Sequence, residues 1–128
     1  MNHLTPKEAH DFLQANRDAV FIDVRSELEF LFVGHPVGAI PIAWYDTPDW
    51  DLNPHFVSEV KMASSFNRPV VLICRSGKRS VEAGLKLEEA GLTEVYNVLH
   101  GFEGDLDDHH RRSTVNGWRY DGLPWEQC

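Results

Sequence analysis

Short apolar runs alternate with amphipathic stretches along this chain, and that alternation limits the folds it can adopt. Runs rich in β-branched residues occupy Ala19–Arg25, Arg68–Cys74 and Glu94–Leu99, and a shorter strand is expected near Ala39 and Ile40. Such runs are typical of strands that are covered on both faces. Helical patterns lie between them, so the sequence predicts an α/β fold with a mainly parallel central sheet flanked by helices.

Two of the expected helices begin with a capping box, in which a hydroxyl side chain is followed three residues later by a glutamate. Thr5 pairs with Glu8 in the first helix, and Ser26 pairs with Glu29 in the second. Gly34 is expected to end the second helix, because glycine commonly follows a helix C-terminus. The apolar side of that helix is expected to comprise Leu28, Leu31 and Phe32.

Two further helices are expected in the middle of the chain. Asn53 and Pro54 have the character of a cap and first-turn pair for a helix that reaches about Phe66. Val81–Ala90 is predicted to be a helix that Gly91 ends. Its solvated stripe would consist of Arg79, Glu82, Lys86 and Glu89, and its apolar surface of Val81, Ala83, Leu85, Leu87 and Ala90.

The composition narrows the class of protein. A chain of 128 residues with 42% hydrophobic content has the size of one compact domain, residues 1–128. The formal net charge of −8 argues against broad binding to nucleic acid or to an anionic membrane. The first residues lack the apolar region of a secretory signal, and no stretch approaches the roughly twenty apolar residues of a membrane span. We therefore expect a cytoplasmic protein whose two cysteines are thiols.

One of these cysteines, Cys74, ends the most clearly marked strand in "VVLICRSGKRS". Ligand sites in open parallel sheets lie at the carboxyl ends of the strands, where the following turn exposes backbone N–H groups. Ser76 and Gly77 allow a tight bend there, and Ser80 either donates a hydrogen bond to the sulfur or simply sits in the first helical turn. The sequence thus predicts an anion cradle at the start of a helix.

The charges of this loop indicate what the cradle holds. Three of the five residues after Cys74 are cationic, namely Arg75, Lys78 and Arg79. These cations and the helix dipole favour a thiolate over a thiol. A lone cysteine is more often inert buried packing, but burial is hard to reconcile with so many nearby cations. A nucleophilic thiolate among cations suits either sulfane-sulfur transfer or phosphoryl-type chemistry.

The motifs of this chain resemble those of a known family. "CRSGKRS" resembles the active-site loop of the rhodanese-like sulfurtransferases, and "DVRSELEFLFVGHPVGAIPI" is similar to the signature that precedes that loop. "NVLHGFEG" and "NGWRYDGLPWEQ" resemble the C-terminal part of the bacterial single-domain members. The resemblance implies a three-layer rhodanese-like fold that spans nearly the whole chain.

The resemblance also implies an activity. Cys74 would take a sulfane sulfur from thiosulfate, release sulfite, and hold a persulfide for delivery to cyanide, a thiol or a sulfur-accepting protein. No metal or organic cofactor is implied. The substrate-binding residues would be Arg75, Ser76, Gly77, Lys78, Arg79 and Ser80, and the charged form of this loop goes with thiosulfate rather than mercaptopyruvate as donor.

Two other functions remain open. A cysteine phosphatase or arsenate reductase would have a similar loop, but the related phosphatases place five residues between the cysteine and the arginine. Here four residues separate Cys74 from Arg79, which leaves a tighter cradle. A non-catalytic, partner-binding or persulfide-relay module is the other alternative, although such modules usually lose the cysteine or the loop cations.

Four polar residues of the upstream signature are expected to be scaffolding: Asp23, Arg25, Glu29 and His35. Asp23 and Arg25 follow a strand and are expected to pair with each other or with backbone groups beside the site. His35 is the one that could instead titrate near neutral pH.

Several other conspicuous residues have a plainer interpretation. His109 and His110 lack further ligands at matched spacing, so a solvated loop is expected there rather than a metal site. The four tryptophans, Trp44, Trp50, Trp118 and Trp125, are expected chiefly to pack in the core or as a lid, and the long loop that carries Trp44 and Trp50 is expected to shape the entrance to the site. Cys128 is expected to be an exposed bystander near the end of the chain.

Overall fold

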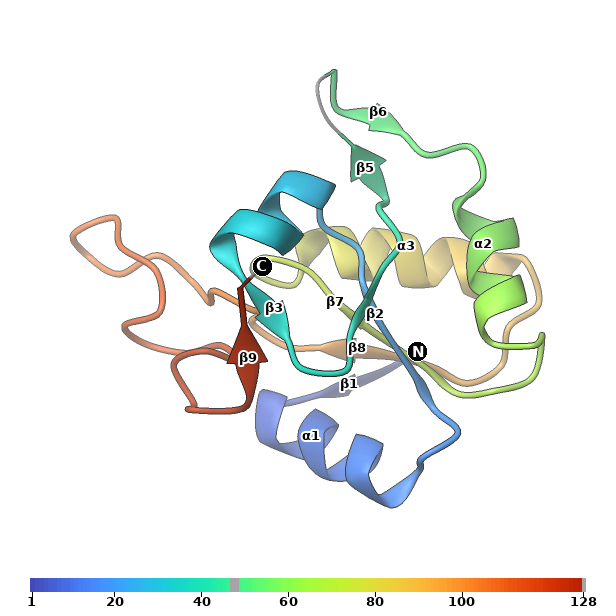
Figure 1. Cartoon of the computed structure of the whole chain (residues 1–128), viewed down its shortest axis with the longest axis horizontal. Helices are drawn as coiled ribbons and strands as arrows, with labels where there is room; N and C mark the ends of the chain where they lie inside the picture. The colour runs from blue at the N-terminus through green and yellow to red at the C-terminus, as the bar shows by residue number, and fades with distance from the viewer. Residues whose placement is uncertain (47–48, 128) are drawn as a thin grey trace.

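A five-stranded, wholly parallel sheet forms the centre of the molecule in the computed structural model, which describes residues 1–46 and 49–127 (Figure 1). The order of the strands across the sheet is β1-β8-β7-β2-β4. Their bounds are β1 (Asn2–Leu4), β2 (Val20–Asp23), β4 (Ile40–Pro41), β7 (Val70–Ile73) and β8 (Val95–Val98). The predicted parallel sheet is confirmed, with the cysteine-bearing strand β7 at its middle.

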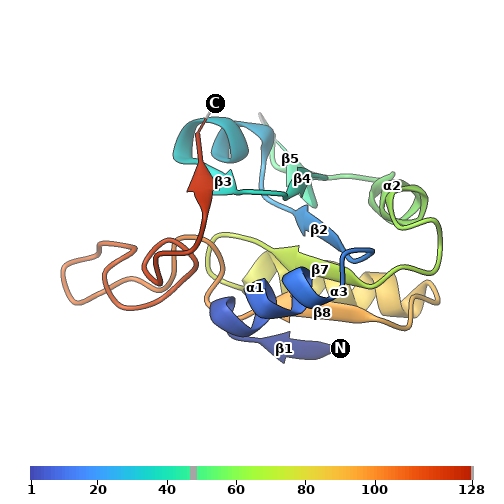
Figure 2. The same cartoon turned by 60° about the horizontal axis from the view of Figure 1, so that its bottom comes forward.

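The sheet separates two apolar cores, because successive side chains of a strand point to opposite faces. Val70 and Leu72 of β7 belong to the core that contains α2 (Phe56–Ala63) and α3 (Lys78–Glu89). Val71 and Ile73 belong to the other core. Helix α1 (Pro6–Ala15) covers that second face (Figure 2). The three layers implied by the family resemblance are therefore present.

Both capping boxes form as the sequence predicts. The amide of Glu8 donates to Thr5 Oγ1 over 3.2 Å, and the amide of Thr5 donates to Glu8 Oε1 over 2.9 Å. Ser26 and Glu29 exchange the corresponding bonds over 3.2 and 3.3 Å. The second helix continues as the π-helical turn η1 (Glu29–Val33) and ends at Gly34, whose φ is +110°.

The apolar side predicted for this second helix is wrong. Phe30 is the buried residue of η1, whereas Leu28 and Phe32 are 51% and 65% exposed. Phe30 stacks on the ring of His35, with 3.7 Å between the ring centroids. A π-helical turn holds more residues per turn than an α-helix, so the side chains rotate away from the positions that α-helical spacing predicts.

Helix α2 is shorter than predicted at both ends. Asn53 lies outside the helix, where its Oδ1 accepts from the amide of His55 and its Nδ2 donates to the carbonyl of Ala43. At the other end Ser65 and Phe66 have φ values of +51° and +68°, which an α-helix cannot accommodate. The apolar pattern there therefore belongs partly to turns.

Helix α3 begins three residues before its predicted start. Gly77 has a left-handed backbone with φ of +107° and is followed directly by helical Lys78. Leu85, predicted to lie on the apolar side, is 55% exposed, while Gly84 is buried in its place against the side chain of Met1. Gly91 follows the end of α3 with φ of +102°, as predicted.

Several very short strands were not predicted. β1 adds an edge to the sheet by pairing with β8. β3 (His35–Pro36) pairs antiparallel with β9 (Trp125–Glu126), and β5 (Tyr45–Asp46) pairs antiparallel with β6 (Asp51–Leu52). Strands of two or three residues carry too little periodicity to be recognised in a sequence. Within the described residues, no helix has the length and apolar character needed to cross a membrane.

The first capping box gives a stability prediction. We expect Thr5→Ala to lower the free energy of unfolding by about 1 kcal/mol, because the Glu8 amide loses its side-chain acceptor. Urea denaturation followed by circular dichroism measures this change. Thr5→Ser is the matched control and should stay close to the parent protein, since it keeps the hydroxyl group.

Candidate active site

Cys74 lies directly after β7 and continues the alternation of that strand. Its side chain therefore shares the face of Val70 and Leu72 and points towards α3. The residue is only 1% exposed, which the cationic loop did not lead us to expect. Cys74 nevertheless lines the floor of a pocket of about 760 Å³, so the sulfur is sunk beneath the surface but is adjacent to an open space.

Two groups at the start of α3 contact the sulfur of Cys74. The amide of Gly77 donates to Sγ over 3.1 Å, and Ser80 Oγ lies 3.2 Å from Sγ. The left-handed backbone of Gly77 turns this amide back towards the strand. The sequence predicts a cradle of amides from Arg75 to Arg79. Among the residues that the structure describes, one of these amides, that of Gly77, bonds to the sulfur.

The walls of the pocket carry both charge and apolar surface. The cationic residues are Arg75, Lys78, Arg79 and Arg112; the apolar and aromatic ones are Val33, Tyr45 and Trp50; the carboxylates are Glu29 and Glu103. Trp50 thus lines the entrance as predicted, whereas Trp44 is buried in the core. Arg112 was missed, because 38 positions separate it from Cys74 and only the folded C-terminal segment brings it to the pocket.

The helical pattern predicts that Arg79 lies on a solvated stripe of α3, and this prediction is wrong. Its guanidinium forms two parallel hydrogen bonds with the carboxylate of Glu29, over 2.7 and 2.9 Å, and lies 5.6 Å from the centroid of the Trp50 ring. Glu29 thus balances the charge of Arg79 across the pocket. Arg75 and Lys78 are exposed at the same pocket.

The ion pair changes the titration of both partners. Burial acts to raise the pKa of Glu29, but the hydrogen bonds and charge of Arg79, together with the bonds from Ser26, lower it to about 2. Burial likewise acts to lower the pKa of Arg79, and the hydrogen bonds and charge of Glu29 raise it overall. The pair is therefore charged throughout the neutral range.

A strap that follows β8 holds the cysteine loop from behind. The amide of Phe102 donates to the carbonyl of Cys74 over 2.8 Å, and the amide of Glu103 donates to the carbonyl of Arg75 over 2.9 Å. Gly101 has φ of +64°, and a Cβ there would collide with the carbonyl of Cys74. The "HGFEG" segment thus fixes the backbone on which the thiol is mounted.

Asp23 and Arg25 are scaffolding, as predicted. Both are completely buried, and Arg25 Nη2 lies 2.7 Å from Asp23 Oδ2 while also donating to the carbonyl of Gly34. His35 is structural as well, because its Nδ1 lies 2.8 Å from the carbonyl oxygen of Phe30. This histidine does not line the pocket at Cys74.

Ser80 lies in the first turn of α3, which is one of the two roles that the sequence left open. Its Oγ lies 3.2 Å from the sulfur, where either atom can be the donor. Its Oγ also donates to Asn97 Oδ1 over 2.5 Å, and Asn97 Nδ2 lies 3.1 Å from His3 Nδ1. Neither Asn97 nor His3 is predicted from the sequence to lie near the site. A buried asparagine inside an apolar strand was the available signal, because such a side chain needs partners.

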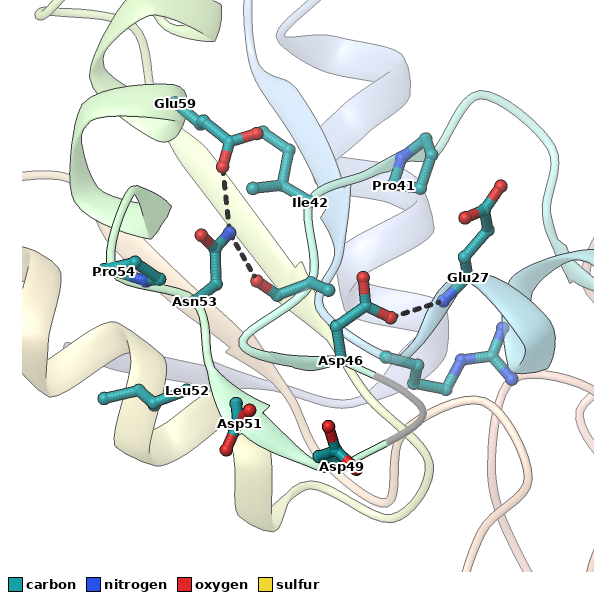
Figure 3. Close-up of a pocket in the computed structure, with 12 residues that line it drawn as sticks. Glu27, Pro41, Ile42, Asp46, Asp49, Asp51, Leu52, Asn53, Pro54 and Glu59 are labelled. Carbon is teal, nitrogen blue, oxygen red and sulfur yellow. Dashed lines mark hydrogen bonds between the residues drawn. The ribbon is translucent and has the colours of Figure 1, made fainter.

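A second hollow is acidic and carries no nucleophile (Figure 3). It is lined by five carboxylates, Glu27, Asp46, Asp49, Asp51 and Glu59. Asn53 bonds to Glu59 across it, over 2.8 Å. Among the described residues, no three or more His, Cys, Asp or Glu side chains are arranged so that they could hold a metal ion, here or near His109 and His110. Cys128 lies outside the described residues.

The comparisons with known proteins agree with this arrangement. The rhodanese-like domain family matches residues 5–107. Rv0390 from M. tuberculosis has a similar structure, with a TM-score of 0.89 and 40% sequence identity over 100% of this chain and 98% of that one. An uncharacterised protein of Rickettsia conorii is 30% identical over 98% of both chains. The thiosulfate sulfurtransferase GlpE of Glaesserella parasuis is 31% identical over 79% of this chain and 82% of its own.

The fold and site are those of an α/β protein in which a cysteine follows the central strand of a parallel sheet at the start of a helix. The chain belongs to the rhodanese-like domain family. Its relatives include proteins named as thiosulfate sulfurtransferases.

The ion pair at the pocket gives a second stability prediction. We expect Glu29→Gln to lower the free energy of unfolding at pH 7 by about 2 kcal/mol, because it leaves the half-buried Arg79 cation without its partner. The pKa of Glu29 is lowered on folding, so its contribution is complete above its ordinary value of 4.5 and is lost as the pH falls towards 2.

Urea denaturation at several pH values measures this difference. The gap between the parent protein and Glu29→Gln should close between pH 4.5 and pH 2. Glu27→Gln serves as the control, since Glu27 is exposed and two positions away. A gap that stayed constant with pH would show that the carboxylate charge is not what stabilises the pair.

Proposed function

We propose that this protein is a thiosulfate sulfurtransferase that carries a sulfane sulfur as a persulfide on Cys74. The observation that supports this most directly is the setting of Sγ: it receives the Gly77 amide, contacts Ser80, and forms the floor of a pocket whose walls carry cations. Hydrogen-bond donors at a sulfur stabilise its anionic form, and the cations suit an anionic donor.

The reaction proceeds in two displacements. The Cys74 thiolate attacks the outer sulfur of thiosulfate, a new S–S bond forms, and the S–S bond of thiosulfate breaks with its electron pair on the departing sulfite. A nucleophilic acceptor, cyanide or a thiol, then attacks the outer sulfur of the persulfide and returns the electron pair to Cys74. Covalent catalysis of this kind divides one transfer into two easier steps.

The charged residues have distinct parts in this scheme. Arg75 and Lys78 are exposed at the pocket and would bind thiosulfate and the sulfite that leaves. Arg112 adds a cation from the C-terminal segment while its Nη1 donates to the carbonyl of Gly104. Arg79 remains on Glu29 and contributes its field at a longer range.

The loop length and the surroundings of the sulfur favour this reaction over phosphate hydrolysis. Four residues separate Cys74 from Arg79, and Arg79 is already occupied by a carboxylate. A phosphatase needs that arginine to hold the equatorial oxygens of the phosphoryl group.

The cytosol, where thiols stay reduced, is the compartment that we propose for a protein with a free catalytic thiol.

The persulfide itself is the decisive test. After brief exposure to thiosulfate, intact-protein mass spectrometry should find one added sulfur atom that a reductant removes. Cys128→Ser should keep this adduct and Cys74→Ser should abolish it. An adduct that persisted in Cys74→Ser, or robust hydrolysis of p-nitrophenyl phosphate without any thiocyanate from thiosulfate and cyanide, would overturn the proposal.

The role of the loop cations gives a kinetic prediction. We expect Lys78→Gln to raise the KM for thiosulfate about threefold to tenfold, because it removes a charge from the wall of the pocket. Lys86→Gln is the matched control on the same helix, where Lys86 pairs with Glu89 and lies away from the pocket. Steady-state assay of thiocyanate formation at low and high salt compares them, and equal KM values would contradict the assignment of Lys78.

A further inference from the structure

A chain of polar side chains leads from the sulfur of Cys74 to the edge strand β1 of the sheet. Cys74 Sγ contacts Ser80 Oγ, which donates to Asn97 Oδ1, and Asn97 Nδ2 points at His3 Nδ1. Ser80 is completely buried and Asn97 is 1% exposed, whereas His3 is exposed on the edge strand β1. The direct pairing of β1 with β8 places His3 beside Asn97 in register.

The hydroxyl of Ser80 has one proton to give. In the observed arrangement Asn97 Oδ1 is its shortest acceptor, at 2.5 Å, against 3.2 Å to the sulfur and 3.2 Å to the carbonyl of Gly77. A hydroxyl that donates to Asn97 presents a lone pair to Sγ. That lone pair can accept a hydrogen bond from a thiol, but it offers no donor to a thiolate or a persulfide anion.

A half-turn of the side-chain amide of Asn97 exchanges its oxygen and its nitrogen. This reverses the direction of the hydrogen bond between Asn97 and Ser80. The two ends of an amide have nearly the same shape, so the exchange moves no other group. Asn97 Nδ2 would then donate to Ser80 Oγ, and the freed hydroxyl proton would turn to the sulfur. Asn97 Oδ1 would face His3 Nδ1, which requires a proton on that nitrogen, and protonation of the imidazole supplies it.

We propose that Asn97 and His3 are positioning residues for sulfur transfer, which together decide whether Ser80 donates its proton to the sulfur on Cys74. This inference rests on the proposed persulfide chemistry of Cys74 and deepens it. Neither residue touches the donor or the reacting sulfur. Protonated His3 holds the network in the form that stabilises an anionic sulfur, and neutral His3 with a bare Nδ1 holds it in the form that suits a thiol.

The other charged groups around His3 come from three elements. Lys78 of α3 and His100 after β8 line the same hollow as His3. Lys78 is exposed there, while His100 Nδ1 lies 3.4 Å from Asp105 Oδ2. The amino terminus, two residues before His3, pairs with Glu88 of α3. Among the described residues of α1, none lines this hollow.

Titration of the Cys74 thiolate by its ultraviolet absorbance tests the network without any sulfur donor. The full chain is used with Cys128→Ser as the background, and the same chain with Cys74→Ser gives the blank. We expect His3→Gln to reduce the ratio of thiolate to thiol about threefold to tenfold at pH 6 and to leave it unchanged at pH 8. The factor at pH 6 is the size expected for the net contribution of one hydrogen bond.

Two further variants separate the network from general charge effects. His100→Gln removes a histidine from the same hollow but no contact to Asn97, so its titration should match the background protein at both pH values. Asn97→Asp places a permanent acceptor beside Ser80, so it should reduce the ratio at pH 6, and His3→Gln should then have no further effect. A His3→Gln titration identical to the background at pH 6, or an equal loss in His100→Gln, would overturn the proposal, and these two variants decide it even if Asn97→Asp fails to fold.

A parallel arm with thiosulfate distinguishes this inference from the proposed function. Sulfite release is measured for the same proteins at the same pH values. A pH-dependent effect of His3→Gln on the thiolate without any sulfite release would uphold the network and refute the sulfurtransferase proposal. Sulfite release that His3→Gln does not alter at pH 6, with an unaltered thiolate, would uphold the proposed function and refute the network.

Discussion

The left-handed turn at Gly77 is the constraint on which the site depends. A strand that leads straight into a helix would carry the cysteine side chain away from the helix amides. With φ of +107°, Gly77 reverses the chain so that its own amide donates to Cys74 Sγ and Ser80, three residues later, also reaches the sulfur. A residue with a Cβ adopts this backbone only at a cost, so the turn needs glycine.

The rest of the molecule keeps that turn in place. The strap at Gly101–Gly104 bonds to the carbonyls of Cys74 and Arg75 from behind, and Glu29 holds Arg79 from the front. Glu29 belongs to η1, which the C-terminal segment supports in turn: Gln127 donates to the carbonyl of Phe32, and Arg119 donates to that of Val33. The Trp125 ring packs against Gly34 at the end of η1, where a side chain would collide with it. The loop that carries Cys74 is thus held by η1, which precedes it in the chain, and by the segment that follows β8.

Positive and negative side chains are separated on this protein, with cations around Cys74 and carboxylates in a neighbouring hollow. The chain is acidic overall, with a net charge of −8, yet cations gather around Cys74. One of them, Arg79, is neutralised by Glu29, so the positive character of the pocket comes from Arg75, Lys78 and Arg112. The acidic hollow near the β5–β6 hairpin lies close by, since that hairpin contributes Tyr45 to one pocket and Asp46 to the other. Anions are therefore favoured at the sulfur and disfavoured beside it.

The sequence by itself determined the layers of the fold, the two capping boxes and the position of Cys74 at the end of the central strand. Each of these follows from local rules: the alternation of apolar residues, the chemistry of a helix start, and the geometry of parallel sheets. Tertiary structure alone decided the burial of the sulfur, the diversion of Arg79 to Glu29, and the arrival of Arg112, Asn97 and His3 near the site. These contacts join residues that lie between 17 and 94 positions apart, as for Ser80 with Asn97 and His3 with Asn97. No local pattern specifies them, because they depend on how separate elements pack.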